Sequence, residues 1–121
     1  MFLNKKKVIL VISVSLLIFF VIFNQVKSQD LRVVDGDTIH LNGEKIRFTG
    51  IDTPELKQTC IKEGVINPCG VTAKEILIEK ISDNQVECIS EGRDRYKRTL
   101  AECFVNDESL SSYLVRSGYA F

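Results

Sequence analysis

The 121-residue sequence lacks any excess of positive charge, with 16 Lys and Arg against 16 Asp and Glu. Residues 1–27 hold four lysines and no acid, so residues 28–121 carry 12 basic against 16 acidic side chains, a net charge of −4. An acidic body does not gather nucleic acid by bulk charge, and a phosphate substrate would need a metal ion and a few well-aimed arginines. The length allows one small domain.

The sequence also has little histidine and no C-x-x-C pair, which argues against a zinc site. The one histidine, His40, falls in a predicted hairpin away from any cysteine. The four cysteines are an even number in a short chain behind an apolar leader, a pattern that is typical of disulfides. Of the three possible pairings we favour Cys60–Cys69, which closes a short loop, and Cys88–Cys103, which joins two neighbouring strands.

One long apolar run, residues 8–23, follows three lysines at 5–7. Its length lies between that of a signal-peptide core and that of a membrane span, and the lysines favour the cytoplasmic side. The sequence therefore predicts a signal peptide or membrane anchor over residues 1–28 and an extracytoplasmic domain, periplasmic or secreted, over 29–121. No Ala-x-Ala follows the run, but residues 26–28 could be cleaved, so removal and retention in the inner membrane both stay open.

The body begins with alternating apolar residues, which predict strands. Asn42-Gly43 separates two of these runs and is a strong hairpin signal, because a type I′ turn needs positive φ at both central positions. Two further strands are predicted towards the carboxyl end, with a turn at Asn106-Asp107 after the second. The five predicted strands are 31–34, 38–41, 44–48, 85–90 and 99–105.

Two helices complete the predicted order of elements. The first covers 71–82 and the second 108–117, where Gly118 marks its carboxyl end. The order of strands, helix, strands and helix predicts an α+β fold, a small barrel-like antiparallel sheet with helices packed on it. The residues expected to face the core are Ala73, Ile76, Leu77 and Ile81 in the first helix and Leu110, Tyr113 and Leu114 in the second.

Three local patterns are candidates for chemistry, and each has an ordinary structural interpretation. VVDGDT at 33–38 could be a simple Asx turn or bulge. RFTGIDTPE at 47–55 places two acids and an arginine at a strand end, where Glu55 could merely cap the next turn. RDRYKR at 93–98 could be a solvated hairpin tip. Taken singly, each pattern favours the structural interpretation.

Taken together and in this order, the three patterns resemble the staphylococcal nuclease (thermonuclease) family, over about residues 31–121. The cysteines resemble an exported branch of that family. The resemblance implies an OB-like antiparallel five-stranded β-barrel packed with helices, and Ca²⁺-dependent hydrolysis of phosphodiester bonds in DNA and RNA. The implied partner is a nucleic-acid substrate, with the membrane as a second partner if the leader is retained, and the implied state is a monomer.

The resemblance also implies a role for each charged position. Asp37, Asp52 and the backbone carbonyl of Thr53 would bind the calcium ion, because carboxylate and carbonyl oxygens suit Ca²⁺. Glu55 would act on the attacking water. The side chains implied to bind the phosphate and to stabilise the charge of the transition state are Arg47 and Arg98, while Asp35 is expected to serve the turn alone.

Three departures from the family pattern set further expectations. Lys97 stands where the family has glycine before its second arginine. An ideal hairpin at Asn42-Gly43 would place Asp37 and Arg47 on opposite faces, unless a bulge near Gly36 or Gly50 intervenes. The chain stops at Phe121, where the last strand of the family begins, so we expect a domain without the last helix. A catalytically weak or inactive module that binds nucleic acid or a partner is therefore the alternative function.

Overall fold

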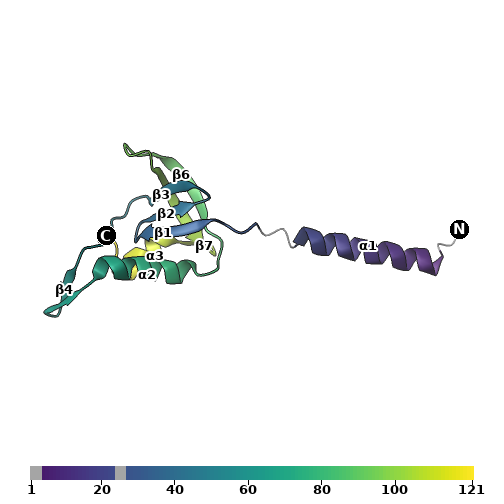
Figure 1. Cartoon of the computed structure of the whole chain (residues 1–121), viewed down its shortest axis with the longest axis horizontal. Coiled ribbons are helices and arrows are strands. Elements are labelled where there is room, and N and C mark those ends of the chain that lie inside the picture. Colours follow the sequence, from purple (N-terminus) through teal and green to yellow (C-terminus); the bar gives the residue numbers. More distant parts are fainter. Residues whose placement is uncertain (1–3, 24–26) are drawn as a thin grey trace.

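The structure, a computed structural model, describes residues 4–23 and 27–121. Helix α1, Lys5–Phe23, is apolar beyond its first lysines and buries no residue against the rest of the chain (Figure 1). It is the one helix of the described residues that is long and apolar enough to cross a membrane, a test that a signal sequence also passes. The predicted cleavage site at 26–28 extends outside the described residues at Val26.

The body is built on one mixed sheet with strand order β1-β2-β3-β7-β6, and a short β8 pairs with β7. The Asn42-Gly43 hairpin is confirmed, because both residues have positive φ and Thr38 lies opposite Arg47 as an ideal two-residue turn requires. The bounds of these strands are β1 Leu31–Asp35, β2 Thr38–Leu41, β3 Glu44–Phe48, β6 Glu87–Arg93, β7 Thr99–Val105 and β8 Glu108–Ser109.

The sheet differs from the predicted one in two respects. The β3–β7 pairing is parallel, with Arg47 beside Leu100, so the sheet is mixed rather than antiparallel. Among the described residues the strands also do not close into a barrel, because the path of paired strands ends at β1 and β6. The parallel pairing is sterically simple, because a long connection containing a helix separates β3 from the β6–β7 hairpin.

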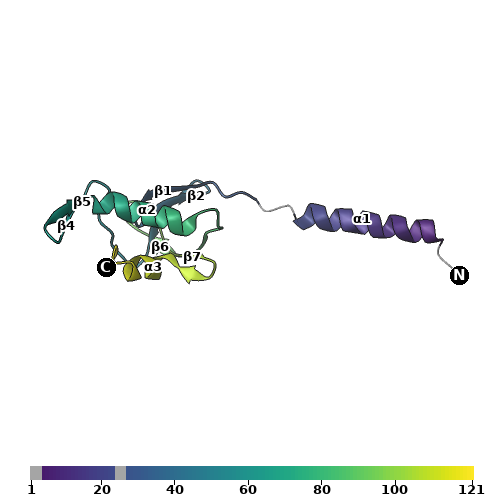
Figure 2. The same ribbon diagram turned by 90° about the horizontal axis from the view of Figure 1, so that it is seen from below.

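Two helices, α2 (Cys69–Ile81) and α3 (Leu110–Arg116), pack against β1 and β7 respectively and contact each other (Figure 2). Helix α3 starts later than predicted because the residues before it, Glu108–Ser109, pair with β7 as strand β8. Gly118 has a positive φ of 81° and ends this helix as predicted. Of the residues expected to face the core, Ala73, Leu77, Ile81, Leu110 and Leu114 are buried, whereas Ile76 and Tyr113 are half-buried.

The cysteine loop forms a small hairpin that the sequence did not predict. Strands β4 (Cys60–Lys62) and β5 (Val65–Asn67) pair across a turn in which both Glu63 and Gly64 have positive φ. This hairpin projects from the body (Figure 1). Both predicted disulfides are confirmed: Cys60–Cys69 ties the hairpin to α2, and Cys88–Cys103 joins directly opposed residues of β6 and β7.

Candidate active site

The Asp35-Gly36-Asp37 turn delivers one buried carboxylate to the end of the sheet. The β1–β2 register shifts between Val33 and Asp35, and the Asp37 N–H donates a hydrogen bond to Asp35 Oδ1 at 3.2 Å. Asp35 thus serves the turn, as expected. Gly36 must lack a side chain, because a Cβ there would lie 2.8 Å from Thr53 Oγ1.

Arg47 joins two of the predicted metal-binding carboxylates. Its Nη1 lies 2.5 Å from Asp37 Oδ1 and its Nη2 lies 2.9 Å from Asp52 Oδ1. Asp37 and Arg47 therefore do not lie on opposite faces as an ideal hairpin alone would place them, and the exception expected for a bulge near Gly36 applies. Asp37 precedes β2, which begins at Thr38, so strand alternation does not govern its side chain, and the bulge in β1 lies next to Gly36.

The Asp37 carboxylate is held by several donors besides Arg47. Thr38 Oγ1 donates to Oδ1 at 3.0 Å, and the Thr53 N–H donates to Oδ2 at 3.1 Å. Burial on its own would raise the pKa of Asp37, which is 4% exposed, but the Arg47 guanidinium and these donors outweigh it, so the pKa is lowered. Burial opposes the charge of Arg47 as well, yet the two carboxylates raise its pKa. Asp37 and Arg47 are therefore both charged at neutral pH.

Asp52 and Thr53 continue the chain from this cluster. Asp52 exchanges two backbone hydrogen bonds with Phe121, at 2.8 and 3.1 Å, while its side chain stays exposed. Thr53 is buried against the Asp37 carboxylate. Two carboxylates and one guanidinium leave the cluster a net charge of −1, and carboxylate and carbonyl oxygens suit a hard cation such as Ca²⁺. The oxygen atoms present are thus of the type that such an ion takes, but no group of three His, Cys, Asp or Glu gathers anywhere in the described chain.

Glu55 follows on an exposed loop beside the start of α2. Its backbone is held on both sides by Gln58, whose side-chain Oε1 accepts the Glu55 N–H at 3.1 Å and whose N–H donates to Glu55 O at 2.7 Å. Within residues 4–23 and 27–121, the Glu55 side chain has no recorded hydrogen bond or ion pair. The alternative role of Glu55, a cap for the turn that follows Pro54, is met only by its backbone, whose carbonyl accepts the Gln58 N–H at 2.7 Å.

Arg98 lies at the base of the β6–β7 tip and is held by Asp94. Its Nε lies 2.6 Å from Asp94 Oδ2, and its backbone N–H donates to Asp94 Oδ1 at 3.0 Å. Arg98 precedes β7, which begins at Thr99, so strand alternation does not place its side chain relative to Arg47. No recorded bond in the described chain joins Arg98 to the other predicted site residues.

Three residues that support the site were missed by sequence reasoning: Gln58, Gly70 and Asp94. Asp94 had a detectable signal, because an aspartate at a hairpin tip commonly accepts the backbone N–H two residues on, as it does here from Tyr96 at 2.9 Å. Gln58 and Gly70 had none, since a glutamine in a loop and a glycine in a helix do not indicate what lies beside them.

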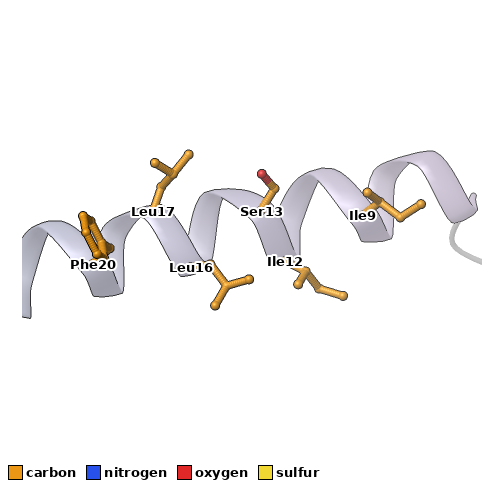
Figure 3. A pocket seen from close by; sticks show the side chains of 6 residues that line it. All are labelled: Ile9, Ile12, Ser13, Leu16, Leu17 and Phe20. Carbon is orange, nitrogen blue, oxygen red and sulfur yellow. The ribbon is translucent and has the colours of Figure 1, made fainter.

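A separate hollow along α1 does not belong to this site. It is lined by Ile9, Ile12, Ser13, Leu16, Leu17 and Phe20, which lie along a single helix (Figure 3). With one hydroxyl among five apolar side chains, this surface suits lipid or another apolar surface rather than a charged substrate.

Comparison with known proteins points to one family. The family described as "Staphylococcal nuclease homologue" matches residues 45–121. A succinoglycan biosynthesis protein, ExoI, of Rhizobium meliloti is 36% identical over 91 residues, covering 73% of this chain and 48% of that protein. The thermonuclease of Staphylococcus intermedius is 34% identical, covering 74% and 55%, and the endonuclease YncB of Bacillus subtilis is 31% identical, covering 74% and 44%. The chain thus spans about half the length of these relatives.

Proposed function

Because the chain belongs to the staphylococcal nuclease homologue family, we propose that it is a Ca²⁺-dependent nuclease that hydrolyses phosphodiester bonds of DNA and RNA. The observation that carries the proposal is the bridge from Arg47 to Asp37 and Asp52, with Glu55 three residues beyond the second carboxylate. The family membership confirms the resemblance drawn from the motifs. The names of the relatives, thermonuclease and endonuclease, support the same activity.

In this proposal Asp37, Asp52 and the Thr53 carbonyl hold the calcium ion. When bound, the ion would neutralise charge on the phosphate oxygens. Asp37 supplies the most constrained of these ligands, because it is buried and three neighbouring groups fix its two oxygens. Asp52 supplies the most accessible carboxylate. This arrangement offers a solvent-facing side on which a phosphodiester can bind.

The remaining steps are assigned to Glu55 and the two arginines. Glu55 accepts a proton from a water molecule, whose oxygen bonds to phosphorus. The phosphorus–oxygen ester bond breaks with its electron pair on the leaving oxygen, which takes up a proton from solvent and departs as a hydroxyl group. Arg47 and Arg98 donate hydrogen bonds to the phosphate oxygens and stabilise the additional negative charge of the transition state. The exposed Glu55 side chain is accessible to solvent water, which supports its assignment as the general base.

The amino-terminal helix and the disulfides support a location for this activity. An apolar helix and two disulfides are compatible with an extracytoplasmic protein. We propose that the domain at 29–121 acts outside the cytoplasm, as a monomer, either released by cleavage or held at the membrane by α1. The substrate would then be nucleic acid outside the cytoplasm.

The test uses the full-length chain, oxidised and kept soluble in detergent micelles, with single-stranded DNA and RNA in the presence of Ca²⁺ or a chelator. Glu55→Gln should lower kcat by about 10²- to 10⁴-fold through loss of the base. Arg98→Ala should lower kcat/KM by about 10²- to 10³-fold through loss of a charge-stabilising donor. Glu75→Gln, an exposed acid on α2, is the matched control and should leave cleavage unchanged.

The alternative, a module that binds without cutting, is favoured by one observation. Arg98 is engaged by Asp94 rather than directed into contact with the Arg47 cluster. If the folded chain binds DNA with Ca²⁺ but does not cut it, the binding module is the correct account. Cutting that survives the chelator would instead contradict the metal dependence.

A further inference from the structure

Resting on the proposed nuclease activity, we infer that Gln58 is a positioning residue that fixes the orientation of Glu55. It acts within a clamp, here called the Glu55 clamp, made of Gln58, Gly70 and the Cys60–Cys69 disulfide. Because the two hydrogen bonds from Gln58 hold the peptide groups on either side of the Glu55 Cα, the main chain is fixed while the side chain stays free to reach a water molecule.

Helix α2 in turn holds Gln58. The Gly70 N–H donates to the Gln58 carbonyl at 3.2 Å, and Cys69 Sγ lies 3.6 Å from the same oxygen. The disulfide from Cys69 to Cys60 closes the segment that follows Gln58. The loop that carries Glu55 is therefore attached to a regular helix at successive points.

Gly70 makes this close attachment possible. A Cβ at this position would lie 1.9 Å from Glu55 O and 2.8 Å from Leu56 O, so any side chain would force the Glu55 backbone away from α2. Gly70 is not among the residues of positive φ, so backbone conformation does not explain the glycine here. The glycine is explained instead by the close approach of the Glu55 peptide to α2.

A second glutamine in the chain also holds the N–H and carbonyl of one residue, in this case with its side-chain amide alone and with no predicted site residue beside it. The Gln29 side chain accepts the Val86 N–H at 2.8 Å and donates to the Val86 carbonyl at 2.7 Å. Val86 is a buried core residue and belongs to no predicted site. Gln29 is therefore a control in which a glutamine clamp serves the fold alone.

The test compares Gln58→Met with Gln58→Glu in the full-length chain. Methionine keeps the length of the side chain but removes the acceptor for the Glu55 N–H, whereas glutamate retains an acceptor oxygen. We expect Gln58→Met to lower kcat about 10-fold with KM unchanged, the low end of what supporting partners of a reactive group cost. Gln58→Glu should restore most of the loss. Gln29→Met should lower the melting temperature and leave kcat unchanged.

Two further measurements separate positioning from a general structural effect. If Gln58 acts through Glu55, Gln58→Met should have no additional effect on kcat in the Glu55→Gln background. Amide hydrogen exchange at Glu55 should also become faster in Gln58→Met while exchange at Val86 is unchanged. An unchanged kcat in an active protein, or the same loss in the Glu55→Gln background, would overturn the inference. An inactive wild-type chain would instead refute the proposed function.

Discussion

The two halves of the candidate site are held in place by different means. The first half, here called the strand-held half, consists of Arg47 in β3 and of Asp37, Asp52 and Thr53, which lie outside the strands but are joined to Arg47 or to one another at the end of the sheet. The loop-held half consists of Glu55 and Arg98, each fixed by a local partner, Gln58 or Asp94, and neither in recorded contact with the strand-held half in the described chain. The first half is built by the fold and the second by short loops.

This difference matches the chemistry proposed for each half. Cation and phosphate binding need fixed donors at fixed distances, and a buried ion pair on a sheet supplies them. Proton transfer and charge stabilisation depend on the orientation of a side chain that must still move with its substrate. Substitutions in the strand-held half should therefore change both stability and activity. Substitutions of the residues that hold Glu55 and Arg98 should change activity by more than their effect on stability explains.

Replacement of Arg47 by methionine should have the largest effect. It leaves the buried Asp37 carboxylate without its cation and removes a phosphate-binding group. We expect the free energy of unfolding to fall by about 3 kcal/mol and kcat/KM to fall by about 10²- to 10³-fold. Urea denaturation and a cleavage assay measure the two effects. Arg47→Lys should recover part of the stability but little of the activity, because lysine cannot bridge both carboxylates.

The wild type and the Arg47→Met variant should also differ in how their stability depends on pH. In the wild type the pKa of Asp37 is below its usual value, so its contribution is complete above the unfolded pKa of about 3.9 and is lost as pH falls through the lower folded value. Without Arg47, burial raises the pKa of Asp37, and the carboxyl destabilises the fold as pH rises. The difference between the proteins should therefore be largest near neutral pH. An equal difference at pH values near 3 and near 7 would contradict the role of the ion pair.

The two disulfides provide the second way to test the comparison. The double variant Cys60→Ala/Cys69→Ala opens the Glu55 clamp, whereas Cys88→Ala/Cys103→Ala opens a bridge between β6 and β7 at the core. Each pair should cost about 3 kcal/mol of unfolding free energy. Only loss of Cys60–Cys69 should lower kcat beyond what stability explains, when both variants are assayed well below their melting temperatures. Equal kcat values would show that the clamp does not need its disulfide.

Local signals explain which parts of the fold could be predicted. The Asn42-Gly43 hairpin, strand β7 and the Gly118 stop follow from turn chemistry and residue spacing, and the structure confirms them. The parallel β3–β7 pairing was missed because it joins segments about fifty residues apart, which no local period encodes. The β4–β5 hairpin was missed because its turn is Glu63-Gly64 rather than Asn-Gly.

The candidate site shows the same contrast between local signals, which could be predicted, and contacts between distant segments, which could not. The motifs indicated the predicted charged residues, and the structure brings Asp37, Arg47 and Asp52 into contact. Alternation alone could not settle the relation between Asp37 and Arg47, because it depends on the irregularity beside Gly36, which the sequence allowed but did not establish. The residues that hold Glu55 could not be predicted, since their role depends on packing between a loop and a helix.

Replacement of Lys97 by glycine should have the smallest effect on stability, and it tests the tip that holds Arg98 in the loop-held half. Its backbone has a φ of 62°, a left-handed conformation that costs an L-residue roughly 1–2 kcal/mol and a glycine almost nothing. After allowing for the greater unfolded-state entropy of glycine, Lys97→Gly should raise the free energy of unfolding by about 0.5 kcal/mol.

Arg95→Gly is the matched control, because it removes a cation from the same tip at a residue without positive φ, and it should lower stability instead. Both variants should keep the Arg98–Asp94 hydrogen bonds, since neither side chain takes part in them. Activity in Lys97→Gly should therefore stay close to that of the wild type at about 0.15 M salt, where the charge of a single exposed lysine is largely screened. A different result would be that Lys97→Gly is less stable than the wild type, by as much as Arg95→Gly. The side chain of Lys97 would then stabilise the tip by more than its backbone strain costs. Arg98 would in that case depend on Lys97 as well as on Asp94.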